Sequence, residues 1–448
     1  MFVSFGNKRF IFSVCAIASV FLSAKIPTFA DTVYWKGNFS DPGLGFYSTG
    51  AWPNETLPTA SDDVVIDENY ITTEGNGYLV DGFWNSDTTW NSLTLNYTNA
   101  DKKINSGANG PVQITITTDL KKLGGGYAKF SMGSAGTVFN LRVGGNVIVG
   151  EDENTAGGSL YLGNVTSYED TDWGGPMDLV TVGGDVILYN NSKLFMNVYN
   201  RNGTSSYYDP DTYIGGSFLF RGSGYPSYQN PTLVLYNLDP AQAPHDTSSI
   251  ISVESLSGSA TLMASSYSYS GSYRTDAILY LRGETKGAHY TFEGWTSDII
   301  YNENNPSFGT TSKLKIVKDG PSTQIFSGTK LMFSGGVEVL GGTLAFNGNA
   351  DGRDTSHGDL TMRGGKFSYM VRNENHLGKS YMTFENLVYS DGTISLQVAP
   401  DSVDKVLLTG TLVAADASNK GVVKIELVGE DLSYFESDYR LLIGMGTA

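Results

Sequence analysis

The sequence lacks several features that would point to common protein classes. Its one cysteine, Cys15, cannot form an intrachain disulfide, and its four histidines have no metal-ligand spacing (His245, His289, His357 and His376). Charged residues make up only 17% of the chain and aromatic residues 12%, which excludes the composition of a disordered protein. Glycine is abundant instead, with 54 glycines among 448 residues. Each interior glycine costs a helix about 1 kcal/mol relative to alanine, so helical bundles and coiled coils are excluded.

The first thirty residues have the pattern of a secretory signal peptide. Lys8 and Arg9 precede an apolar run over residues 10–24, and the small residues of Pro27–Ala30 follow. The run is shorter than the roughly 18 apolar residues of a spanning helix, so we expect cleavage after Ala30. Cys15 lies inside the run and not at the cleavage point, which argues against a lipid anchor.

The remaining chain is strongly acidic. Removing residues 1–30 deletes three basic residues and no acidic ones, which changes the formal charge from −17 to −20. Such a surface repels phosphate backbones and anionic lipids, so we expect no nucleic-acid partner and no binding to a membrane surface.

Short alternating runs predict an all-β protein. Apolar or aromatic residues recur at every second position between Gly, Asn, Asp and Ser, which is the pattern of strands, and no window shows the 3.6-residue period of a helix. The runs lie at residues 63–66, 92–97, 112–117, 141–149, 180–189, 232–238, 277–282, 337–346, 360–371, 393–398 and 422–428.

A Gly-Gly pair recurs between two strand segments. Intervals between the first glycines are 39, 32 and 23 residues, and the pairs begin at Gly144, Gly183, Gly215, Gly341 and Gly364. A glycine pair supplies the positive φ of a tight bend or bulge, and repetition at this period is typical of stacked repeats. We therefore predict a right-handed parallel β-helix with looped insertions, and we assign the Tyr-rich stretches 201–231 and 263–275 to such loops.

Tandem β-sandwich domains are the alternative fold. Against them, no Pro-rich linker divides the chain and no Cys…Trp…Cys spacing occurs. In the β-helix interpretation, residues 1–30 are the signal peptide, 31–110 the N-terminal cap and first coils, and 111–400 the β-helix. Residues 401–448 then form a C-terminal β segment.

Residues 312–349 resemble the autotransporter-associated β-strand repeat. The residues that carry the resemblance are Lys318 and Gly320, Ser327 and Gly328, Phe333 to Gly336, and Gly341 to Leu344. The start of the mature chain is also similar to bacterial surface proteins of this kind, through Trp35, Gly50, Ala51, Trp52, Pro58, Asp62 and Asp63. The resemblance implies a β-helical passenger exported by a Gram-negative-type bacterium to its cell surface or outer membrane, or secreted.

The sequence departs from that family at its end. We expect no C-terminal translocator barrel in the 448 residues, and Ala448 comes soon after the apolar run Tyr439–Ile443. This favours a truncated product over the alternative, a secreted protein that uses the repeat without self-transport. From the resemblance we expect a non-catalytic surface protein, adhesin-like or structural. A carbohydrate-active β-helix enzyme, a polysaccharide lyase or hydrolase, is the alternative.

Four acidic clusters could carry chemistry, but loops rich in Asp, Asn and Gly also form turns for backbone reasons alone. One cluster mixes acid, base and cation, as a catalytic patch or Ca²⁺ site requires: Asp351, Asp354 and Asp359 with Arg353 and His357. The others are Glu151, Asp152 and Glu153; Glu169, Asp170 and Asp172; and Asp209 and Asp211. We predict solvated loops in each case, and thus no enzyme, catalytic residue, metal or cofactor.

Tyrosine-rich loops are the better candidates for ligand binding. Tyrosine combines a flat apolar ring with a hydroxyl, which suits sugar stacking or protein contact. The candidates are Tyr267, Tyr269, Tyr225 and Tyr228, with Tyr207 and Tyr208 in a comparable loop. Surface glycans or other surface proteins are the partners we expect, although the rings could simply pack on the flank of the rod.

Overall fold

The computed structural model describes most of the chain between Ala30 and Gly429. The described residues are 30–36, 49–70, 87–96, 98, 102–106, 112–132, 139–152, 155, 157–163, 179–197, 207, 210–222, 230–236, 249–265, 277–298, 313–328, 330–347, 357–369, 381–399, 402–403, 405–416 and 421–429. The predicted signal peptide lies outside this set except for Ala30.

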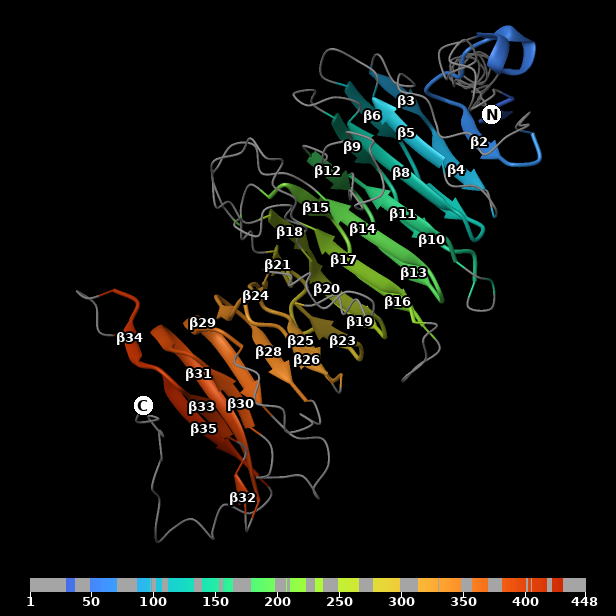
Figure 1. Ribbon diagram of the computed structural model, residues 1–448. Helices are drawn as coiled ribbons and strands as arrows, with labels where there is room; N and C mark the ends of the chain where they lie inside the picture. The colour runs from blue at the N-terminus through green and yellow to red at the C-terminus, as the bar shows by residue number, and fades with distance from the viewer. Residues whose placement is uncertain are drawn as a thin grey trace, which may run out of the picture.

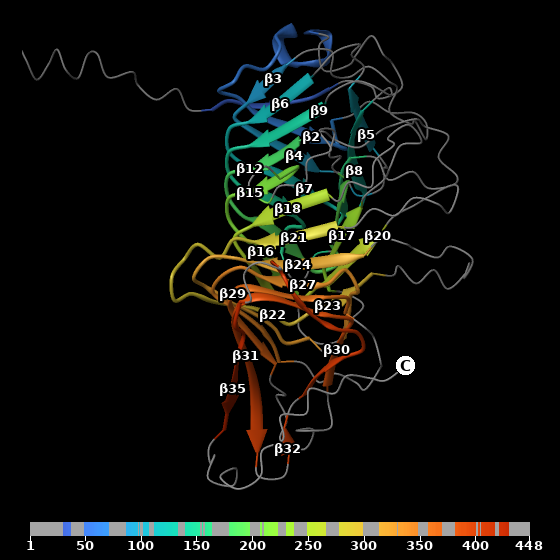
Figure 2. The same ribbon diagram turned by 90° about the vertical axis from the view of Figure 1, so that its left-hand side faces the viewer.

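Three short strands build one coil of the molecule. In a representative coil these are β6 (Val112–Ile116), β7 (Leu120–Leu123) and β8 (Tyr127–Met132). The next coil begins with β9 (Phe139–Val143), which pairs in parallel with β6. Successive coils therefore stack strand on strand from the N-terminal to the C-terminal end (Figures 1 and 2).

Stacking produces three ladders of parallel strands. Besides β6 and β9, the first ladder contains β3 (Thr88–Trp90), β12 (Leu179–Val182), β15 (Thr212–Ile214), β18 (Ser249–Val253), β21 (Ala277–Leu281), β24 (Leu314–Lys318), β27 (Val337–Val339), the first parts of β29 (Leu360–Tyr369) and β31 (Leu387–Ala399), and β34 (Leu412–Ala414).

The second ladder runs beside the first. Besides β7, it contains β1 (Thr32–Tyr34), β2 (Asp63–Asp67), β4 (Ser92–Asn96), β10 (Val147–Val149), β13 (Val186–Tyr189), β16 (Phe218–Arg221), β19 (Leu256–Gly258), β22 (His289–Phe292), β25 (Thr323–Phe326), β28 (Thr343–Phe346), the later parts of β29 and β31, and β35 (Lys424–Val428).

The third ladder closes each coil. Besides β8, it contains β5 (Lys102–Ser106), β11 (Ser159–Leu162), β14 (Lys193–Asn197), β17 (Thr232–Tyr236), β20 (Thr261–Ser265), β23 (Trp295–Ser297) and β26 (Leu331–Met332). The pair β30 (Tyr381–Phe384) and β33 (Lys405–Leu408) takes the equivalent place in later coils. The exception to parallel pairing is β32 (Ser402–Val403), which is antiparallel to β31.

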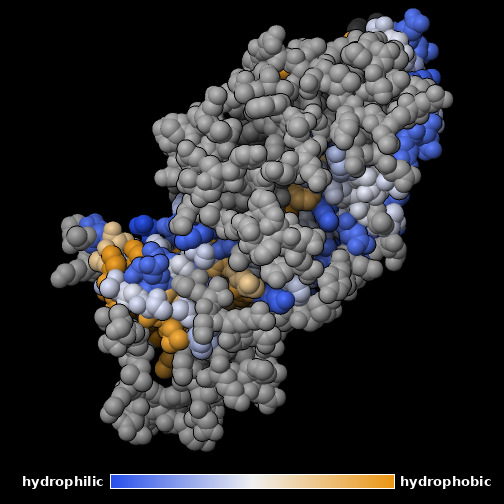
Figure 3. Space-filling view, viewed as in Figure 1, coloured by the Kyte–Doolittle hydropathy of each residue, from blue (hydrophilic) through white to orange (hydrophobic). Residues whose placement is uncertain are grey.

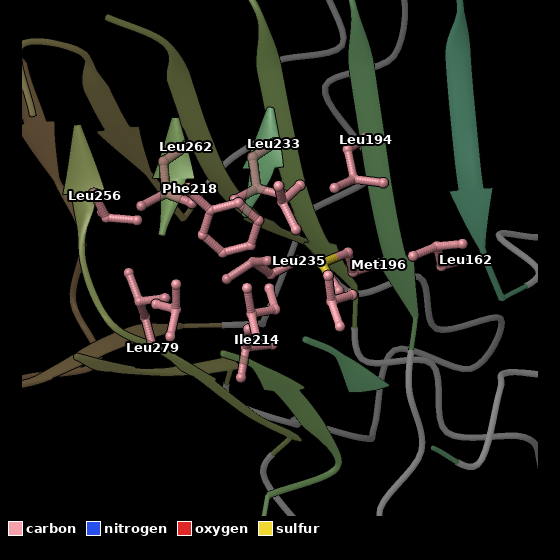
Figure 4. Close-up of a cluster of buried hydrophobic side chains, with 14 of the residues drawn as sticks. Leu162, Leu194, Met196, Ile214, Phe218, Leu233, Leu235, Leu256, Leu262 and Leu279 are labelled. Carbon is pink, nitrogen blue, oxygen red and sulfur yellow. The ribbon is translucent and has the colours of Figure 1, made fainter. Parts of the chain in front are cut away.

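The hydrophobic core lies inside the coils. Strand side chains alternate between two faces, so every second residue of each ladder points inward. Figure 4 shows leucines from all three ladders converging with Phe218, among them Leu279 of the first, Leu256 of the second and Leu233 of the third. All four side chains are fully buried. Each coil alone could not bury these residues, so neighbouring coils stabilise one another.

The prediction of an all-β parallel β-helix is confirmed, and the sandwich alternative is wrong because sandwiches are built from antiparallel strands. Coil length varies as expected for looped insertions: Thr212 pairs with Ile251, 39 residues later, whereas Ile316 pairs with Val337 after 21. One detail is wrong. Residues 201–231 were assigned to a loop but contain strands β15 and β16, and β20 reaches into the stretch 263–275.

The Gly-Gly pairs form the corner between the first and second ladders, for a reason that differs from the prediction. Gly183 and Gly215 have no positive φ. A Cβ at Gly183 would lie 2.2 Å from the carbonyl oxygen of Gly144 in the preceding coil, and a Cβ at Gly215 would lie 2.3 Å from that of Gly183. The corner therefore requires glycine because backbone stacks directly on backbone. Positive φ is found at the second glycines Gly342 and Gly365.

Side chains at the same corner form a ladder of their own. Asp119 Oδ1 accepts a hydrogen bond from the backbone N–H of Asn146 at 2.8 Å. In turn, Asn146 Oδ1 accepts from the N–H of Asp185 at 2.8 Å, and Asp185 Oδ1 from the N–H of Ser217 at 2.7 Å. The link continues to Ser255, whose Oγ lies 2.7 Å from that of Ser217. Backbone donors that a bend leaves unpaired are thus satisfied from coil to coil.

The two ends of the rod differ. At the N-terminal end, Trp35, Trp52 and Trp90 are almost fully buried, next to the short 3₁₀ turns η2 (Thr49–Ala51) and η3 (Pro53–Glu55). These side chains cover the N-terminal end of the described core. At the other end, apolar residues are exposed on the last coils, as Figure 3 shows: Leu412, Val413, Val422, Ile425 and Val428.

The Lys-x-Gly sequence at residues 318–320 stabilises a corner between two strands of one coil. Lys318 is fully buried, and its ammonium donates to the carbonyl oxygens of Asp319 and Gly320, the latter at 3.1 Å. Gly320 has a φ of 66°. Lys122 repeats the arrangement with the carbonyl oxygens of residues 123 and 124. Burial lowers the pKa of both lysines to about 8, with nearby carboxylates opposing the shift.

The ladders continue through the two domain boundaries expected from the sequence. Strands β4 and β5 pair with β7 and β8 across residue 110, and β31 pairs with β34 and β35 across residue 400.

Candidate functional site

A pocket of about 460 Å³ opens on the outward face of the first ladder. Its volume lies within the roughly 300–1,000 Å³ of small-molecule sites. We name it the tyrosine pocket, and its lining residues are Tyr207, Pro210, Tyr213, Ser252, Tyr280, Arg282, Glu284, Asp319, Gly320 and Pro321.

Three consecutive coils supply a column of outward side chains in the pocket. Tyr213 of β15 is in register with Ser252 of β18, which is in register with Tyr280 of β21. These residues alternate with the inward Ile251 and Leu279, so they face away from the core. Tyr213 is 38% exposed, whereas Tyr280 is only 4% exposed. The column therefore offers one accessible ring beside one that is already covered.

Tyr207, which lies between β14 and β15, covers the ring of Tyr280. The two rings are stacked, with centroids 5.2 Å apart and an interplanar angle of 13°. Tyr207 also packs against a second, small apolar cluster on this outward face, made of Ile250, Ile278, Tyr280 and Val317. Tyr207 thus lies over side chains of later coils and forms one wall of the pocket.

Tyr207 is anchored by a charged cluster that we name the Glu338 cluster: Glu338, Lys315, Arg363 and Tyr207. Glu338 accepts hydrogen bonds from the Tyr207 hydroxyl at 2.7 Å, from Lys315 at 2.6 Å and from Arg363 at 2.7 Å. Burial opposes ionisation of Glu338, but these donors outweigh it and hold its pKa below the usual value. The cluster joins residues that are 131 positions apart in the sequence.

Arg282 forms the charged floor of the pocket and is 8% exposed. Its Nη2 donates to the carbonyl oxygens of Ile214 at 2.7 Å and Gly215 at 2.9 Å, and its Nη1 donates to Ser252 Oγ at 2.9 Å. The guanidinium also lies 4.5 Å from the ring centroid of Tyr213, within cation–π distance. Arg282 is therefore held rigidly, with most of its donors already used by the fold.

Two carboxylates line the pocket. Glu284 Oε1 lies 3.3 Å from Arg282 Nε, although the buried Nε makes no hydrogen bond of good geometry. Asp319 accepts from the Tyr280 hydroxyl at 2.7 Å and from the Gly320 N–H at 2.7 Å. Each carboxylate retains further lone pairs with which it can accept a hydrogen bond from a ligand.

A third carboxylate lies behind the pocket. Glu254 is 9% exposed and accepts from the backbone N–H groups of Glu284 at 2.9 Å and Thr285 at 3.1 Å. Burial raises its pKa, but these bonds and the Tyr290 hydroxyl outweigh burial, so the net pKa is below the usual value. Glu254 therefore fixes the turn that carries Glu284.

Ring faces and hydrogen-bond acceptors together define what the pocket can bind. Tyrosine and proline supply flat apolar surface, and the carboxylates supply acceptors for hydroxyl groups. Among the described residues, no group of three or more His, Cys, Asp or Glu side chains could hold a metal ion. The arrangement suits a small polyhydroxylated ligand.

Four of the sequence-predicted binding residues lie outside the described residues: Tyr267, Tyr269, Tyr225 and Tyr228. Tyr208 also lies outside them. Tyr207 is the one member of these loops that the structure places in the pocket.

The mixed acidic cluster is structural where it is described. His357 is 7% exposed, its Nδ1 lies 3.0 Å from the carbonyl oxygen of Phe333, and its ring centroid is 4.7 Å from that of Phe333. Burial lowers the pKa of His357 from 6.5 to about 4, and the bond to Phe333 opposes this shift. Asp359 accepts from the Asn386 backbone and side chain. Asp351, Arg353 and Asp354 lie outside the described residues.

The other acidic clusters also serve the backbone as far as they are described. Asp152 accepts from the Thr155 N–H at 2.8 Å, and Asp211 from the Ile250 N–H at 3.1 Å. Glu151 is exposed. The remaining members lie outside the described residues: Glu153, Glu169, Asp170, Asp172 and Asp209.

Comparisons with protein-family models, with curated proteins and with solved structures found no match to this chain. Within the described part of the chain, no helix has the length and hydrophobicity needed to cross a membrane.

Sequence reasoning missed Tyr213, Tyr280, Arg282, Glu284 and Asp319. One signal was present: Tyr213 and Tyr280 each occupy a position in an alternating run where the neighbours on both sides are core residues. Outward aromatic residues of this kind mark a covered or binding face once the register between coils is known.

Proposed function

We propose that this chain is an exported, non-catalytic surface protein, of adhesin-like or structural passenger type, that binds carbohydrate in the tyrosine pocket. Export rests on the predicted signal peptide that ends at Ala30. The surface role rests on the resemblance of residues 312–349 to the autotransporter-associated repeat. Its setting is the secreted or cell-surface compartment of a Gram-negative-type bacterium, where glycans and other surface proteins are the available partners.

One observation supports the carbohydrate ligand above others. An accessible tyrosine ring, Tyr213, lies in the same pocket as the carboxylates of Glu284 and Asp319. Sugars present an apolar C–H face and a rim of hydroxyl donors, and the pocket offers the complementary ring face and acceptors. Rigid walls reduce the entropy lost on binding, and Arg282 and Tyr280 are both held by hydrogen bonds.

The proposal is tested with the purified mature chain on a glycan array, followed by titration of the glycans that bind. A Tyr213→Ala variant removes the accessible ring, and we expect it to lose most of the binding. Tyr70→Ala is the matched control, because Tyr70 is 46% exposed and lies outside the pocket. Absence of glycan binding by the wild type, or equal binding by the Tyr213→Ala variant, would contradict the proposal.

A carbohydrate-active enzyme is the second candidate, since two carboxylates share the pocket. Glycoside hydrolysis requires one carboxyl group that gives a proton to the leaving oxygen. Here Glu284 lies beside Arg282, and Asp319 accepts from Tyr280 and Gly320, so both carboxylates face donors. This arrangement suits binding better than proton donation. Release of new reducing or unsaturated ends from polysaccharides, lost in Glu284→Gln, would favour the enzyme.

A further inference from the structure

We infer that the tyrosine pocket selects uncharged sugar units and rejects acidic ones. This inference rests on the proposed carbohydrate binding and adds the chemical class of the ligand. It follows from the charges that line the pocket and from what each charge already does in the fold.

Carboxylates outnumber cations in the pocket. Glu284 and Asp319 line it with Arg282, and no other charged residue is among its lining residues. Glu254 lies directly behind Glu284, through hydrogen bonds to the backbone of residues 284 and 285. A uronate or other anionic sugar placed here would meet like charges on two sides.

Arg282 cannot offset this repulsion fully, because three of its five N–H donors are hydrogen-bonded to the fold and its Nε is buried beside Glu284. Both hydrogens of Nη2 are taken by the carbonyl oxygens of Ile214 and Gly215, and one hydrogen of Nη1 goes to Ser252. Glu284 lies 3.3 Å from Nε. A bidentate Arg–carboxylate pair, the usual way to hold an acidic sugar, needs two free donors on one edge. Arg282 has one Nη1 hydrogen left for a ligand, which is enough for a hydroxyl group.

No cation other than Arg282 is among the lining residues of the pocket. Lys315 and Arg363 both donate to Glu338, and Lys318 is fully buried with its ammonium on backbone carbonyls. Glu338 therefore offsets one of the two charges of Lys315 and Arg363, and the charge of Lys318 is enclosed by the fold. The formal charge of −20 for the mature chain, which is −17 less the three basic residues of positions 1–30, adds long-range repulsion of the same sign.

The remaining surface fits a neutral pyranose. Tyr213 offers exposed ring surface, Pro210 and Pro321 extend the apolar wall, and Glu284 and Asp319 have lone pairs that can accept from hydroxyl donors. Hydrogen bonds from hydroxyls to carboxylates are of the stronger, charge-assisted kind.

The experiment compares neutral gluco-, manno- and galacto-oligosaccharides with oligogalacturonate of equal length, by titration calorimetry or NMR at fixed ionic strength. We expect at least one neutral series to bind and the uronate to bind at least about tenfold more weakly. Tyr213→Ala weakens neutral binding roughly tenfold, the factor that ~1.4 kcal/mol of lost ring contact produces. Tyr213→Phe retains it, and the Tyr70→Ala control is unchanged.

A second variant reports on charge alone. Glu284→Gln keeps the shape of the side chain, which is 68% exposed, and removes one carboxylate. We expect it to improve uronate binding about fivefold relative to neutral binding, as ~1 kcal/mol of relieved repulsion at an exposed site implies. Titrations at low and high salt should show a larger discrimination at low salt.

The outcomes separate the two proposals. If no oligosaccharide binds, the proposed function fails and the selectivity with it. If uronate binds as tightly as the neutral series and Tyr213→Ala abolishes both, the proposed function stands and the selectivity is wrong. If neutral sugars bind but Glu284→Gln leaves the ratio unchanged, the charge argument is wrong.

Discussion

Replacing Gly183 by alanine tests the close stacking of backbone at the glycine corner. The added Cβ would lie 2.2 Å from the carbonyl oxygen of Gly144, and real Cβ atoms stay beyond 3.0 Å, so the two coils must move apart by about 0.8 Å at this point. Hydrogen bonds link the coils on both sides of the contact. The Gly183 N–H donates to Val143 at 2.7 Å and the Gly184 N–H to Gly145 at 2.8 Å.

The cost can be worked from these contacts. A displacement of that size weakens or breaks two backbone hydrogen bonds, each worth about 1 kcal/mol net. Overpacking adds about 1–3 kcal/mol, and the reduced freedom of the unfolded chain returns about 0.4–1 kcal/mol. We therefore expect Gly183→Ala to lower the free energy of unfolding by about 2–5 kcal/mol.

Gly125→Ala is the matched control. A Cβ at Gly125 would meet its nearest atom, the carbonyl oxygen of Thr98, at 3.6 Å, which is ordinary contact, and Gly125 has no positive φ. Urea unfolding followed by circular dichroism gives the midpoint of each variant, and hydrogen exchange shows whether protection is lost at the coils around residue 183. If Gly183→Ala and Gly125→Ala unfold within about 0.5 kcal/mol of each other, the steric argument is wrong.

Three further predictions concern buried ionisable groups. The pKa of Lys318 is lowered to about 8, below its value of 10.5 in an unfolded chain, so the free energy of unfolding should rise by up to about 3 kcal/mol between pH 8 and 10.5. Urea unfolding midpoints measured over this pH range should rise less in the Lys318→Met variant than in the wild type. Equal rises in the two proteins would contradict this prediction. The pKa of His357 is also lowered, from 6.5 to about 4, so stability should fall by up to about 3 kcal/mol as pH drops through that window. The His357→Phe variant should lose less stability than the wild type between pH 6.5 and 4. An equal loss in the two proteins would contradict the statement that His357 is buried as a neutral ring. Glu338→Gln should free Tyr207 and weaken sugar binding several-fold with an intact fold by circular dichroism; unchanged affinity would show that Tyr207 is not a wall of the occupied site.

Many strands of the first two ladders could be predicted because they are alternating runs. Val112–Ile116 and Val186–Tyr189 are examples, with apolar residues at the buried positions. The third ladder was largely missed. Its strands mix polar and aromatic residues with the buried apolar ones, as in Lys193–Asn197 and Ser159–Leu162, so their alternation is weak in the sequence. The buried residues of these strands can be identified only once the path of the complete three-strand coil is known.

The glycine pairs were located by the sequence but explained by the structure. The sequence of one segment shows only that a residue without a Cβ is present. A special local conformation, such as a positive φ, is then the natural explanation for the glycine. At Gly183 the reason is the carbonyl oxygen of Gly144, 39 residues earlier. That contact depends on the register between coils, which no local pattern contains.

The candidate site was less predictable for the same reason. Tyr213 and Tyr280 are 67 residues apart, and the insertions between them differ in length from coil to coil. Asp319 reaches the site from a third coil through a turn after β24. Loops rich in tyrosine drew attention to Tyr207, but its partner Glu338 lies 131 residues away. Spacing along the sequence therefore could not bring these residues together.

The burial pattern of two strands argues that the pocket is a built feature. A coil needs apolar residues only on its inward face, yet β18 and β21 are buried at all five positions. Their outward Ile250 and Ile278 join the small cluster on which Tyr207 packs. On an exposed face of a β-helix such residues would form an apolar strip that promotes aggregation. The outward face of these coils therefore carries an apolar surface on which Tyr207, one wall of the pocket, packs. Tyr213 remains accessible in the same pocket.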